Sequence, residues 1–348
     1  MNIDIERSAA YYNELGLKEF SEGNPINAAS LLKKSYLVSG NEQGILVNLG
    51  LSLMQQGMDK AAERCYKIAL NSKDIKTVRA ANKNLGLIHL WRGEWEEGWL
   101  HHGKRYAGEP FERTQWKGEP LNGKSLIIWN DIGMGDLFQF VRYTKILIER
   151  GENIILAVDK SQINLVEEFL CWPLKVIDRN EIIPPPEDTP HIPLMSLVGL
   201  LDPTTTWGRN WTEPTWRIER KSMKQNKIGI CWASNPQDKT MYNYKSSNIE
   251  KFLYHIKLEN DLNEVISLQT GENASHKRHR LSQAESCWIN TINQIAKCKK
   301  VHSVDTAVAH LAAGSMVPVK LHLAKTHDWR WKGEGNKWYC NLSICEDL

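Results

Sequence analysis

The hydrophobic and polar positions in the first third of the chain follow a helical spacing that repeats. Each repeat has a Leu-Gly pair and a second glycine seven positions after the first: Leu15-Gly16 with Gly23, Leu49-Gly50 with Gly57, and Leu85-Gly86 with Gly93. A glycine in the first helix of each repeat allows a second helix to approach closely, and the later glycine can end that first helix. The pattern therefore predicts successive pairs of packed helices over residues 1–108.

This pattern resembles the tetratricopeptide repeat, whose units are pairs of antiparallel helices. Ala28 and Ala62 occupy the small-residue position of the second helix, and the third unit departs from the pattern with Gly98 and His102. Terminal repeats are often atypical because one face must cap the stack. Two functions are open for such an array: a platform that holds a protein or glycan acceptor, and a scaffold that supports the next part of the chain.

From Ser125 onward, short hydrophobic runs alternate with segments of helical spacing. The strands expected from this alternation lie at 125–129, 154–158, 174–177, 227–232, 264–268, 300–304 and 318–323. The helices expected between them lie at 137–150, 161–170, 248–258, 286–297 and 306–314. Strand–helix alternation predicts parallel sheets with helices on both faces. A segment rich in Trp, Thr and Pro at 203–216 separates two such series, so we expect two α/β domains, at 109–215 and 216–348.

Composition and charge exclude several classes of protein. The 348 residues include 44 Lys and Arg against 41 Asp and Glu, and a net charge of only +3 argues against a nucleic-acid partner. The seven cysteines form no CxxC pair, so we expect no zinc ribbon. The start MNIDIERSAA has no signal-peptide pattern, and no run approaches the ~20 apolar residues of a membrane span. These features predict a cytoplasmic protein without a transmembrane segment.

The first candidate site segment is the turn Gly133-Met-Gly-Asp136, which follows the first expected strand. Gly133 and Gly135 allow a tight turn into a helix, and Asp136 falls in the first turn of that helix. Two roles are open for Asp136: a general base, and a helix cap that accepts hydrogen bonds from free N–H groups. As a base, it should face the helix start near Asp305 across a gap wide enough for a sugar.

The second candidate segment is the loop Cys231-Trp-Ala-Ser-Asn-Pro236, directly after another strand. Backbone amides in this loop and the hydroxyl group of Ser234 could bind a phosphate. Lys239 and Lys245 follow and could neutralise a diphosphate, although a polar surface loop would also explain Lys239. We therefore expect Ser234, Lys245 and Thr306 to surround one diphosphate site.

The third candidate segment is Ser303-Val-Asp-Thr-Ala-Val-Ala-His310, in which a strand runs straight into a helix. The amides and the dipole of a helix start favour an anion, and Asp305 and Thr306 are also expected to cap this helix. His310 lies four residues after Thr306 on the same helical face. For His310 a ligand contact and a buried core position are both open.

Several motifs occur in an order that resembles a known family. They are Trp116-Lys-Gly-Glu-Pro-Leu-Asn-Gly-Lys124, the GMGD turn, Pro193-Leu-Met-Ser-Leu197, the CWASNP loop, Ser267-Leu-Gln-Thr-Gly271, SVDTAVAHLA and Asp328-Trp-Arg-Trp331. Together they look like bacterial tetratricopeptide proteins whose catalytic part is similar to the family 9 glycosyltransferases, relatives of the heptosyltransferases. The fold class implied is α + α/β: tetratricopeptide helical repeats followed by a GT-B-like pair of Rossmann-type parallel-sheet domains.

The resemblance also implies roles for single residues. Asp136 matches the aspartate that acts as base on the acceptor hydroxyl, and Asp305, Thr306 and Ala307 match a segment that touches the sugar and the phosphates. Ser234 and Asn235 match the phosphate loop, and Gln269 lies where such enzymes contact the nucleoside. The residues implied in donor binding are Ser234, Asn235, Lys245, Gln269, Asp305, Thr306, Ala307 and His310. The implied donor is a nucleotide-diphosphate sugar, bound without a metal ion.

Three departures from the family pattern affect the functional prediction. Lys245-Ser246 stands where the family usually has Arg-Ser, which keeps the charge but loses the bidentate geometry of arginine. The turn at 313–318 differs from the usual Gly-Lys-Pro-Val, and the expected C-terminal helix of the GT-B fold is shortened or absent before Leu348. Two hypotheses therefore stand: an inverting glycosyltransferase, and a tetratricopeptide interaction module with a degenerate, nucleotide-binding transferase fold.

Overall fold

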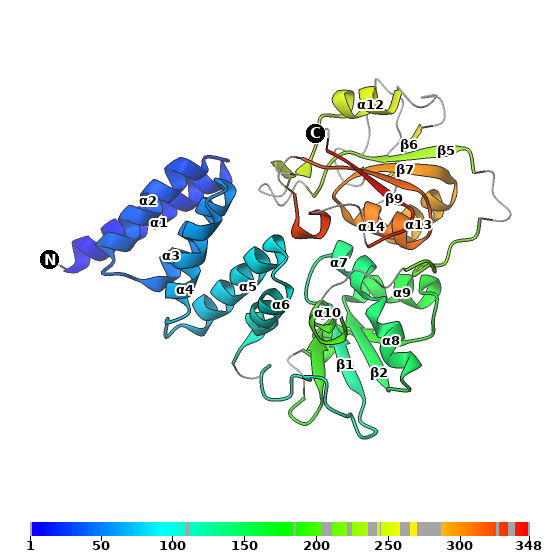
Figure 1. Ribbon diagram of the computed structural model, residues 1–348, viewed down its shortest axis with the longest axis horizontal. Helices are drawn as coiled ribbons and strands as arrows, with labels where there is room; N and C mark the ends of the chain where they lie inside the picture. Colours follow the sequence, from blue (N-terminus) through cyan, green and yellow to red (C-terminus); the bar gives the residue numbers. More distant parts are fainter. Residues whose placement is uncertain are drawn as a thin grey trace. The chain divides into compact units, whose positions relative to one another are not determined.

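The computed structural model divides the chain into two compact units, Met1–Arg113 and Thr114–Leu348 (Figure 1). The structure describes residues 2–108, 111–183, 186–202, 211–220, 225–235, 242–243, 245–257, 265–269, 287–324, 327–332 and 338–346. The first unit is helical, and the second contains two parallel sheets.

The first unit consists of helices that pack in consecutive pairs along the chain. The helices are α1 Asn2–Ser21, α2 Pro25–Val38, α3 Gln43–Gln55, α4 Asp59–Ala69, α5 Ile75–Arg92 and α6 Trp95–Gly103, followed by the 3-10 turn η1 Lys104–Tyr106. α1 packs on α2, α3 on α4 and α5 on α6. The prediction of successive helix pairs is thus confirmed, whereas their assignment to the tetratricopeptide family stays a prediction.

Glycines in the first helix of each pair allow the second helix to approach closely. A Cβ built on Gly50 would lie 2.3 Å from Cε1 of Tyr66, and one built on Gly86 would lie 2.6 Å from the backbone nitrogen of His102. The later glycines have the left-handed backbone that ends a helix, as at Gly93, where φ is 77°. Both expected uses of glycine are therefore observed.

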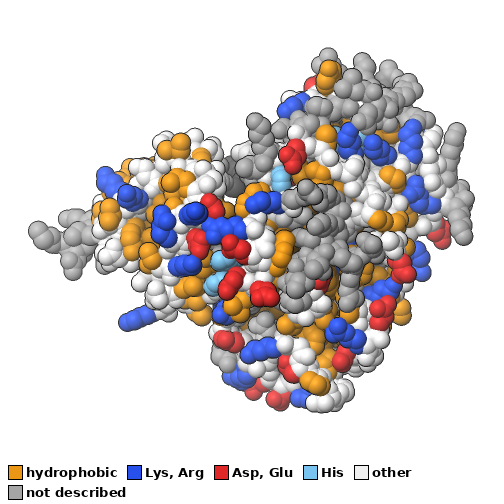
Figure 2. All heavy atoms as spheres, in the orientation of Figure 1, with side chains coloured by type: hydrophobic (Ala, Val, Ile, Leu, Met, Phe, Trp, Pro, Cys, Tyr) orange, Lys and Arg blue, Asp and Glu red, His pale blue; other side chains and the backbone are white. Residues whose placement is uncertain are grey.

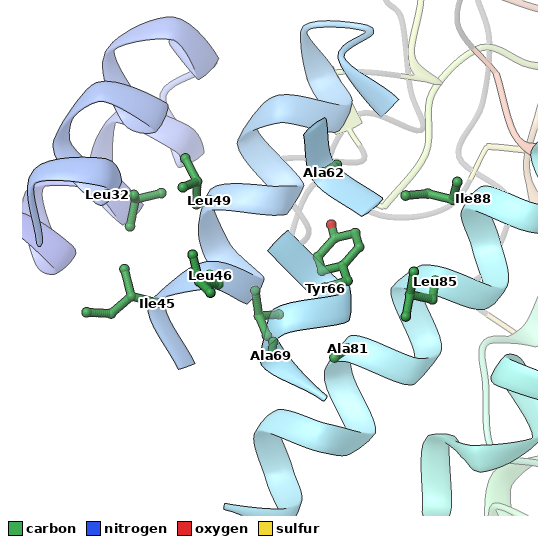
Figure 3. Packing of buried hydrophobic residues seen from close by; sticks show 11 residues of the cluster. Leu32, Ile45, Leu46, Leu49, Ala62, Tyr66, Ala69, Ala81, Leu85 and Ile88 are labelled. Carbon is green, nitrogen blue, oxygen red and sulfur yellow. The ribbon is translucent and has the colours of Figure 1, made fainter. Parts of the chain in front are cut away.

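The core of the first unit is apolar and lies between α2, α3, α4 and α5 (Figure 3). Tyr66 on α4 is fully buried and lies between the side chains of α3 and those of Leu85 and Ile88 on α5. Leu46 and Leu49 cover the other side of the cluster, from α3. Because neighbouring pairs share this cluster, the packing of each pair depends on the next.

The first sheet of the second unit is fully parallel, with strand order β3-β2-β1-β4. Its strands are β1 Leu126–Trp129, β2 Ile154–Val158, β3 Lys175–Asp178 and β4 His191–Pro193. Its helices are α7 Met134–Phe140, α8 Tyr143–Glu149, α9 Ile163–Phe169 and α10 Ser196–Leu201, with 3-10 turns η2 Lys160–Gln162 and η3 Arg179–Glu181. All four residues of β1 are buried, as expected for a central strand of a parallel sheet.

The second sheet is also parallel, with strand order β6-β5-β7-β8-β9. Its strands are β5 Lys227–Cys231, β6 Val265–Ser267, β7 Cys298–Val304, β8 Val319–His322 and β9 Leu342–Cys345. Its helices are α12 Ile249–Lys257, α13 Trp288–Ala296 and α14 Ala307–Gly314, and the 3-10 turn η7 spans Trp329–Trp331. Figure 1 shows α12 on one face of this sheet and α13 and α14 on the other.

Trp216 connects the two halves of the second unit. Its indole is fully buried, meets the ring of Phe138 edge to face with centroids 5.2 Å apart, and donates from Nε1 to the carbonyl of Phe138 at 3.1 Å. On the other side, a Cβ built on Gly314 would lie 2.9 Å from Cδ1 of Trp216. Trp216 therefore packs against both α7 and the end of α14, and glycine is required at 314.

The structure corrects several predicted element boundaries. The helix expected at 137–150 is two helices, α7 and α8, separated at Val141 and Arg142. Both linking residues keep right-handed helical backbone angles, so the hydrophobic spacing continues through the break and conceals it. β4 and β9 were not predicted; β4 has only three residues, too few to show an alternating pattern. Residue 264 and most of the separating segment, 203–210, lie outside the described residues.

Candidate functional site

The candidate site lies where α7 and α14 begin, after the carboxyl ends of β1 and β7. The two helix starts pack directly on one another, because a Cβ built on Gly135 would lie 3.3 Å from Cδ2 of His310 and 3.5 Å from Cα of Ala307. The two helix starts are therefore in contact at Gly135, whereas the sugar-wide gap expected between Asp136 and the Asp305–Thr306 turn stays a prediction. Glycine at 135 makes the close contact possible, since any side chain there would crowd α14.

Asp136 lies in the first turn of α7, as predicted, but its carboxylate does not cap that helix. Oδ1 forms an ion pair and hydrogen bond with Nη2 of Arg330. Gly133 is the N-cap residue, and its backbone is extended. Burial raises the pKa of the Asp136 carboxyl above its ordinary value, and the Arg330 guanidinium opposes that rise. Asp136 is thus a largely buried carboxylate whose charge is balanced by a neighbouring cation.

Arg330 is a residue of this site that the sequence analysis did not single out. It lies in η7, and Asp328 accepts a hydrogen bond from its backbone N–H at 3.1 Å and lies 3.3 Å from its Nη1. Burial works against the charge of the guanidinium, but Asp328 and Asp136 raise its pKa above the ordinary value. The signal in the sequence was the Asp-Trp-Arg-Trp motif, in which an Asp and an Arg stand between bulky apolar residues.

Lys245 and Asp305 form a second buried ion pair. Nζ of Lys245 lies 2.7 Å from Oδ2 of Asp305, and 21% and 7% of the two side chains are exposed. Burial disfavours the charged form of Asp305, but Lys245 and, more weakly, His310 and Arg330 lower its pKa below the ordinary value. The loop after β5 and the turn after β7 are thus joined by opposite charges.

His310 is buried beside this pair and contacts two aromatic side chains, Tyr339 and Trp331. Its Nδ1 lies 3.0 Å from the hydroxyl of Tyr339, and its ring stacks on Trp331 with centroids 5.4 Å apart. Its Nε2 lies 3.9 Å from Oδ1 of Asp305. Burial lowers the pKa of His310 to about 3, so the imidazole is neutral at neutral pH. These contacts fit the core position considered for His310, and a ligand contact remains a proposal.

Thr306 and Ala307 begin α14, but not with the expected side-chain cap. Thr306 is the N-cap residue by its backbone, and the prediction that its side chain caps the helix is wrong. Its hydroxyl lies 3.1 Å from Oγ of Ser303 and 3.5 Å from Sγ of Cys231. The carboxylate of Asp305 accepts a hydrogen bond from Lys245. The first amides of α14 are therefore not capped by the Thr306 side chain.

Gln269 holds the loop that follows β5. Its amide forms two hydrogen bonds with the backbone of Ala233, each 3.0 Å long, one from Ala233 N to Oε1 and one from Nε2 to Ala233 O. Sγ of Cys231 lies 3.4 Å from the same Oε1. Cys231 therefore connects Gln269 with Thr306, so two of the predicted donor-binding residues lie on either side of one thiol.

Ser234 and Asn235 continue this loop. The N–H of Ser234 donates to Oγ of Ser246 at 2.9 Å, whereas Oγ of Ser234 is buried and has no partner among the residues that the structure describes. Asn235 is exposed at the end of the described segment, and Lys239 lies outside the described residues. The structure thus brings the Ser234 loop to the same end of the second sheet as Thr306, through the contact between Cys231 and Thr306.

Lys and Arg side chains are interspersed with Asp and Glu over the described surface in Figure 2. Within the described ranges, no group of three or more His, Cys, Asp and Glu side chains lies close enough together to hold a metal ion. No helix among the described residues is both long and apolar enough to cross a membrane.

No protein-family model and no curated protein matches this sequence. Among solved structures, the chain is similar to the iron-containing dodecameric glycosyltransferase TibC from enterotoxigenic E. coli H10407, with 12% identity over 60% of this chain and a TM-score of 0.42. That match spans 59% of the TibC chain. The chain is also similar to the E. coli heptosyltransferase WaaC solved with ADP, with 11% identity, coverage of 64% of this chain and 93% of WaaC, and a TM-score of 0.45.

A third similar structure is a family 9 glycosyl transferase from Veillonella parvula DSM 2008, with 11% identity, coverage of 66% and 88% of the two chains, and a TM-score of 0.40. At these identities and TM-scores the likenesses establish no family for this chain.

Proposed function

We propose that this protein is a glycosyltransferase that moves a sugar from a nucleotide-diphosphate donor to a protein or glycan acceptor. One observation carries the proposal. Segments that lie far apart in the sequence, around Asp136, Ser234, Lys245 and Asp305, meet where strands end and helices begin, through the contacts of Gly135, Lys245 and Cys231. Open α/β sheets bind their ligands at this edge.

In this proposal, the second sheet binds the donor. Lys245 and the first amides of α14 at Thr306 and Ala307 stabilise the negative charge of the departing diphosphate. Ser234 contributes a hydroxyl, and Gln269 keeps the loop in place. These groups supply both the positive charge and the hydrogen-bond donors that the diphosphate needs. The proposed reaction therefore requires no metal ion.

Asp136 is the proposed general base. The acceptor hydroxyl gives its proton to the Asp136 carboxylate while the oxygen of that hydroxyl attacks the anomeric carbon of the donor sugar. The bond between that carbon and the diphosphate oxygen breaks, and the electron pair leaves with the nucleotide diphosphate. A single displacement of this kind inverts the configuration of the anomeric carbon. The helix pairs of the first unit are the proposed tetratricopeptide array, with the acceptor platform and the structural scaffold as its two possible roles.

A nucleotide-binding experiment tests the proposal. Thermal unfolding of the full chain is followed with ADP, GDP, UDP and sugars linked to each, with and without EDTA. A ligand that binds only the native state increases the free energy of unfolding by RT ln(1 + [L]/Kd) and thereby raises the unfolding temperature. We expect the nucleotides of one nucleobase to raise the unfolding temperature, by the same amount with and without EDTA. The substitution Lys245→Met should reduce this rise. Failure of every nucleotide to bind would overturn the proposal.

A second candidate function is nucleotide binding without sugar transfer. Two ion pairs favour this function: Arg330 neutralises the proposed base Asp136, and Asp305 neutralises the proposed diphosphate-binding Lys245. The test is the release of nucleotide from the donor that binds best. Binding with no release, in the presence of candidate glycan and protein acceptors, would favour the second function.

A further inference from the structure

Asp136 and Arg330 come from opposite halves of the second unit and meet at the proposed site. Nη2 of Arg330 binds Oδ1 of Asp136. Oδ2 has no hydrogen-bond partner among the described residues, and 15% of the Asp136 side chain is exposed. One oxygen of the carboxylate is therefore held, and the other is available.

The guanidinium that holds Oδ1 is itself fixed in place. It lies over the ring of Phe140 at 5.4 Å and over that of Trp329 at 5.3 Å. The carboxylate of Asp328 contacts Nη1 of Arg330 and accepts a hydrogen bond from the backbone N–H of Arg330. The indole N–H of Trp338 donates to the backbone carbonyl of Arg330 at 3.0 Å. A planar guanidinium that packs against two aromatic rings and pairs with Asp328 presents its N–H groups in a fixed direction, which a flexible lysine ammonium does not.

We propose that Arg330 is a positioning residue for Asp136: by binding Oδ1 it fixes the rotation of the carboxylate and favours its ionised form, so that Oδ2 faces the acceptor and receives its proton. The inference rests on the proposed transferase function. Arg330 contacts neither the donor nor the acceptor in this account and acts only through Asp136.

The electrostatic surroundings of Asp136 explain why such a residue is needed. Burial favours the protonated form of a carboxyl group, and a protonated Asp136 could not accept a proton. The charged groups that act on Asp136 are Arg330 and Lys245, which favour the ionised form, and Asp328 and Asp131, which oppose it. His310, on the facing helix, is neutral at neutral pH. Arg330 is the largest of the contributions that oppose protonation.

The proton and electron pairs balance in the proposed step. The acceptor O–H bond breaks, its proton moves to Oδ2, and the acceptor oxygen forms a bond to the anomeric carbon. The electron pair of the broken anomeric bond stays with the nucleotide diphosphate. Asp136 returns its proton to water before the next turnover, while the ion pair with Arg330 restores the starting orientation.

The test compares Arg330→Gln and Arg330→Lys in the full chain, with Arg220→Gln as the control. Arg220 is also partly buried in the second unit and donates to the carbonyl of Cys298, so its loss removes a guanidinium and a hydrogen bond away from Asp136. The first measurement is kcat against pH. In Arg330→Gln we expect the acidic limb of the kcat–pH profile to shift to higher pH by about one unit or more, because an adjacent arginine lowers the pKa of an aspartate by that order. Arg330→Lys should restore the limb but not the full kcat, while KM for the donor stays unchanged.

A second measurement does not depend on turnover. The Asp136 carboxyl is titrated by ¹³C NMR, with its signal assigned by its loss in Asp136→Asn. We expect its midpoint to rise in Arg330→Gln and not in Arg220→Gln. If Arg330→Gln does not fold, Arg330→Lys still decides, because a kcat equal to that of the native protein would refute orientation by the guanidinium.

The two measurements separate the failure of this inference from failure of the proposed function. An unchanged acidic limb and an unchanged titration in an active Arg330→Gln protein would overturn the positioning role and leave the transferase intact. If the Asp136 titration shifts as expected but the protein consumes no nucleotide sugar, the proposed transferase function is overturned. The Asp136–Arg330 pair then has no catalytic role.

Discussion

Nζ of Lys245 lies 2.7 Å from Oδ2 of Asp305. This bond joins the loop after β5 to the turn after β7, so it brings together two segments that the sequence separates by 60 positions. It also means that the lysine proposed to meet the diphosphate is already neutralised. A diphosphate must therefore share Lys245 with Asp305 or replace the carboxylate, and each outcome weakens the Lys245–Asp305 pair.

The pair predicts a stability loss in acid. The folded-state pKa of Asp305 lies below its value of 3.8 in the unfolded chain, so its contribution to the free energy of unfolding is present above 3.8 and is lost as the pH falls through the folded value. Urea unfolding of the native chain and of Asp305→Asn should therefore show a difference that is largest near neutral pH and shrinks below about pH 4. Glu14→Gln changes an exposed carboxylate and serves as the control. A difference that stays constant with pH would contradict the pairing.

His310 gives a pH dependence in another range. Its folded pKa is about 3, against 6.5 in the unfolded chain, so below 6.5 the unfolded chain binds a proton that the folded chain does not. The stabilising effect of the neutral imidazole is complete above 6.5 and falls with decreasing pH, by about 1.4 kcal/mol per pH unit. We expect His310→Gln to remove this slope between about pH 6.5 and pH 4.

The same prediction can be checked directly on the ring. The ¹H NMR signals of His310 should not titrate between about pH 8 and pH 5, because the imidazole remains neutral in the folded state. A midpoint near 6.5 would show that the ring is not desolvated as the structure describes.

The sequence was informative where local chemistry determines structure. The four-residue apolar run of β1 followed by Gly133 and Gly135 predicted a buried strand, a turn and a helix start, because these features depend on neighbouring residues. The turn at Asp305 and Thr306 was predictable for the same reason. Paired helices in the first unit followed from glycines that recur at a fixed spacing.

The sequence could not reveal which side chains meet across the fold. Arg330 lies 194 positions from Asp136, and no local pattern connects them. The role of Asp136 illustrates the consequence, because a helix cap and a general base were both considered, whereas its bond to Arg330 was not. Short elements were missed for a simpler reason: β4 spans three residues and shows no period.

The contact between α7 and α14 predicts opposite effects for one substitution at two nearby positions. Gly135→Ser would place a Cβ 3.3 Å from Cδ2 of His310 and a hydroxyl in the same crowded space, so we expect a loss of about 1–3 kcal/mol. Gly133→Ser meets only Oδ2 of Asp136, at 3.8 Å, and serine is favoured at an N-cap. Chemical denaturation should therefore show Gly135→Ser to be destabilised and Gly133→Ser to be as stable as the native chain or more so. Equal stabilities would show that the helix starts do not pack together.

The first unit makes a comparable prediction for the contact between α3 and α4. A Cβ on Gly50 would lie 2.3 Å from Cε1 and 2.6 Å from Cζ of Tyr66, whose ring is fully buried in the cluster of Figure 3. Gly50→Ala must displace this ring or separate the helices, and we expect a loss of about 1–3 kcal/mol or more. Gly103→Ala, at the last residue of α6, meets nothing within 4 Å and should gain up to about 1 kcal/mol from its helix propensity.

Thermal unfolding of the full chain by circular dichroism distinguishes the two alanine variants. The double variant Gly50→Ala with Tyr66→Leu adds a further test, because the smaller side chain makes room for the new methyl group. If steric conflict with Tyr66 is the cause, the double variant should lose less stability than the sum of the two single variants. Additive losses would place the cost of Gly50→Ala elsewhere and would contradict the close approach of α3 and α4.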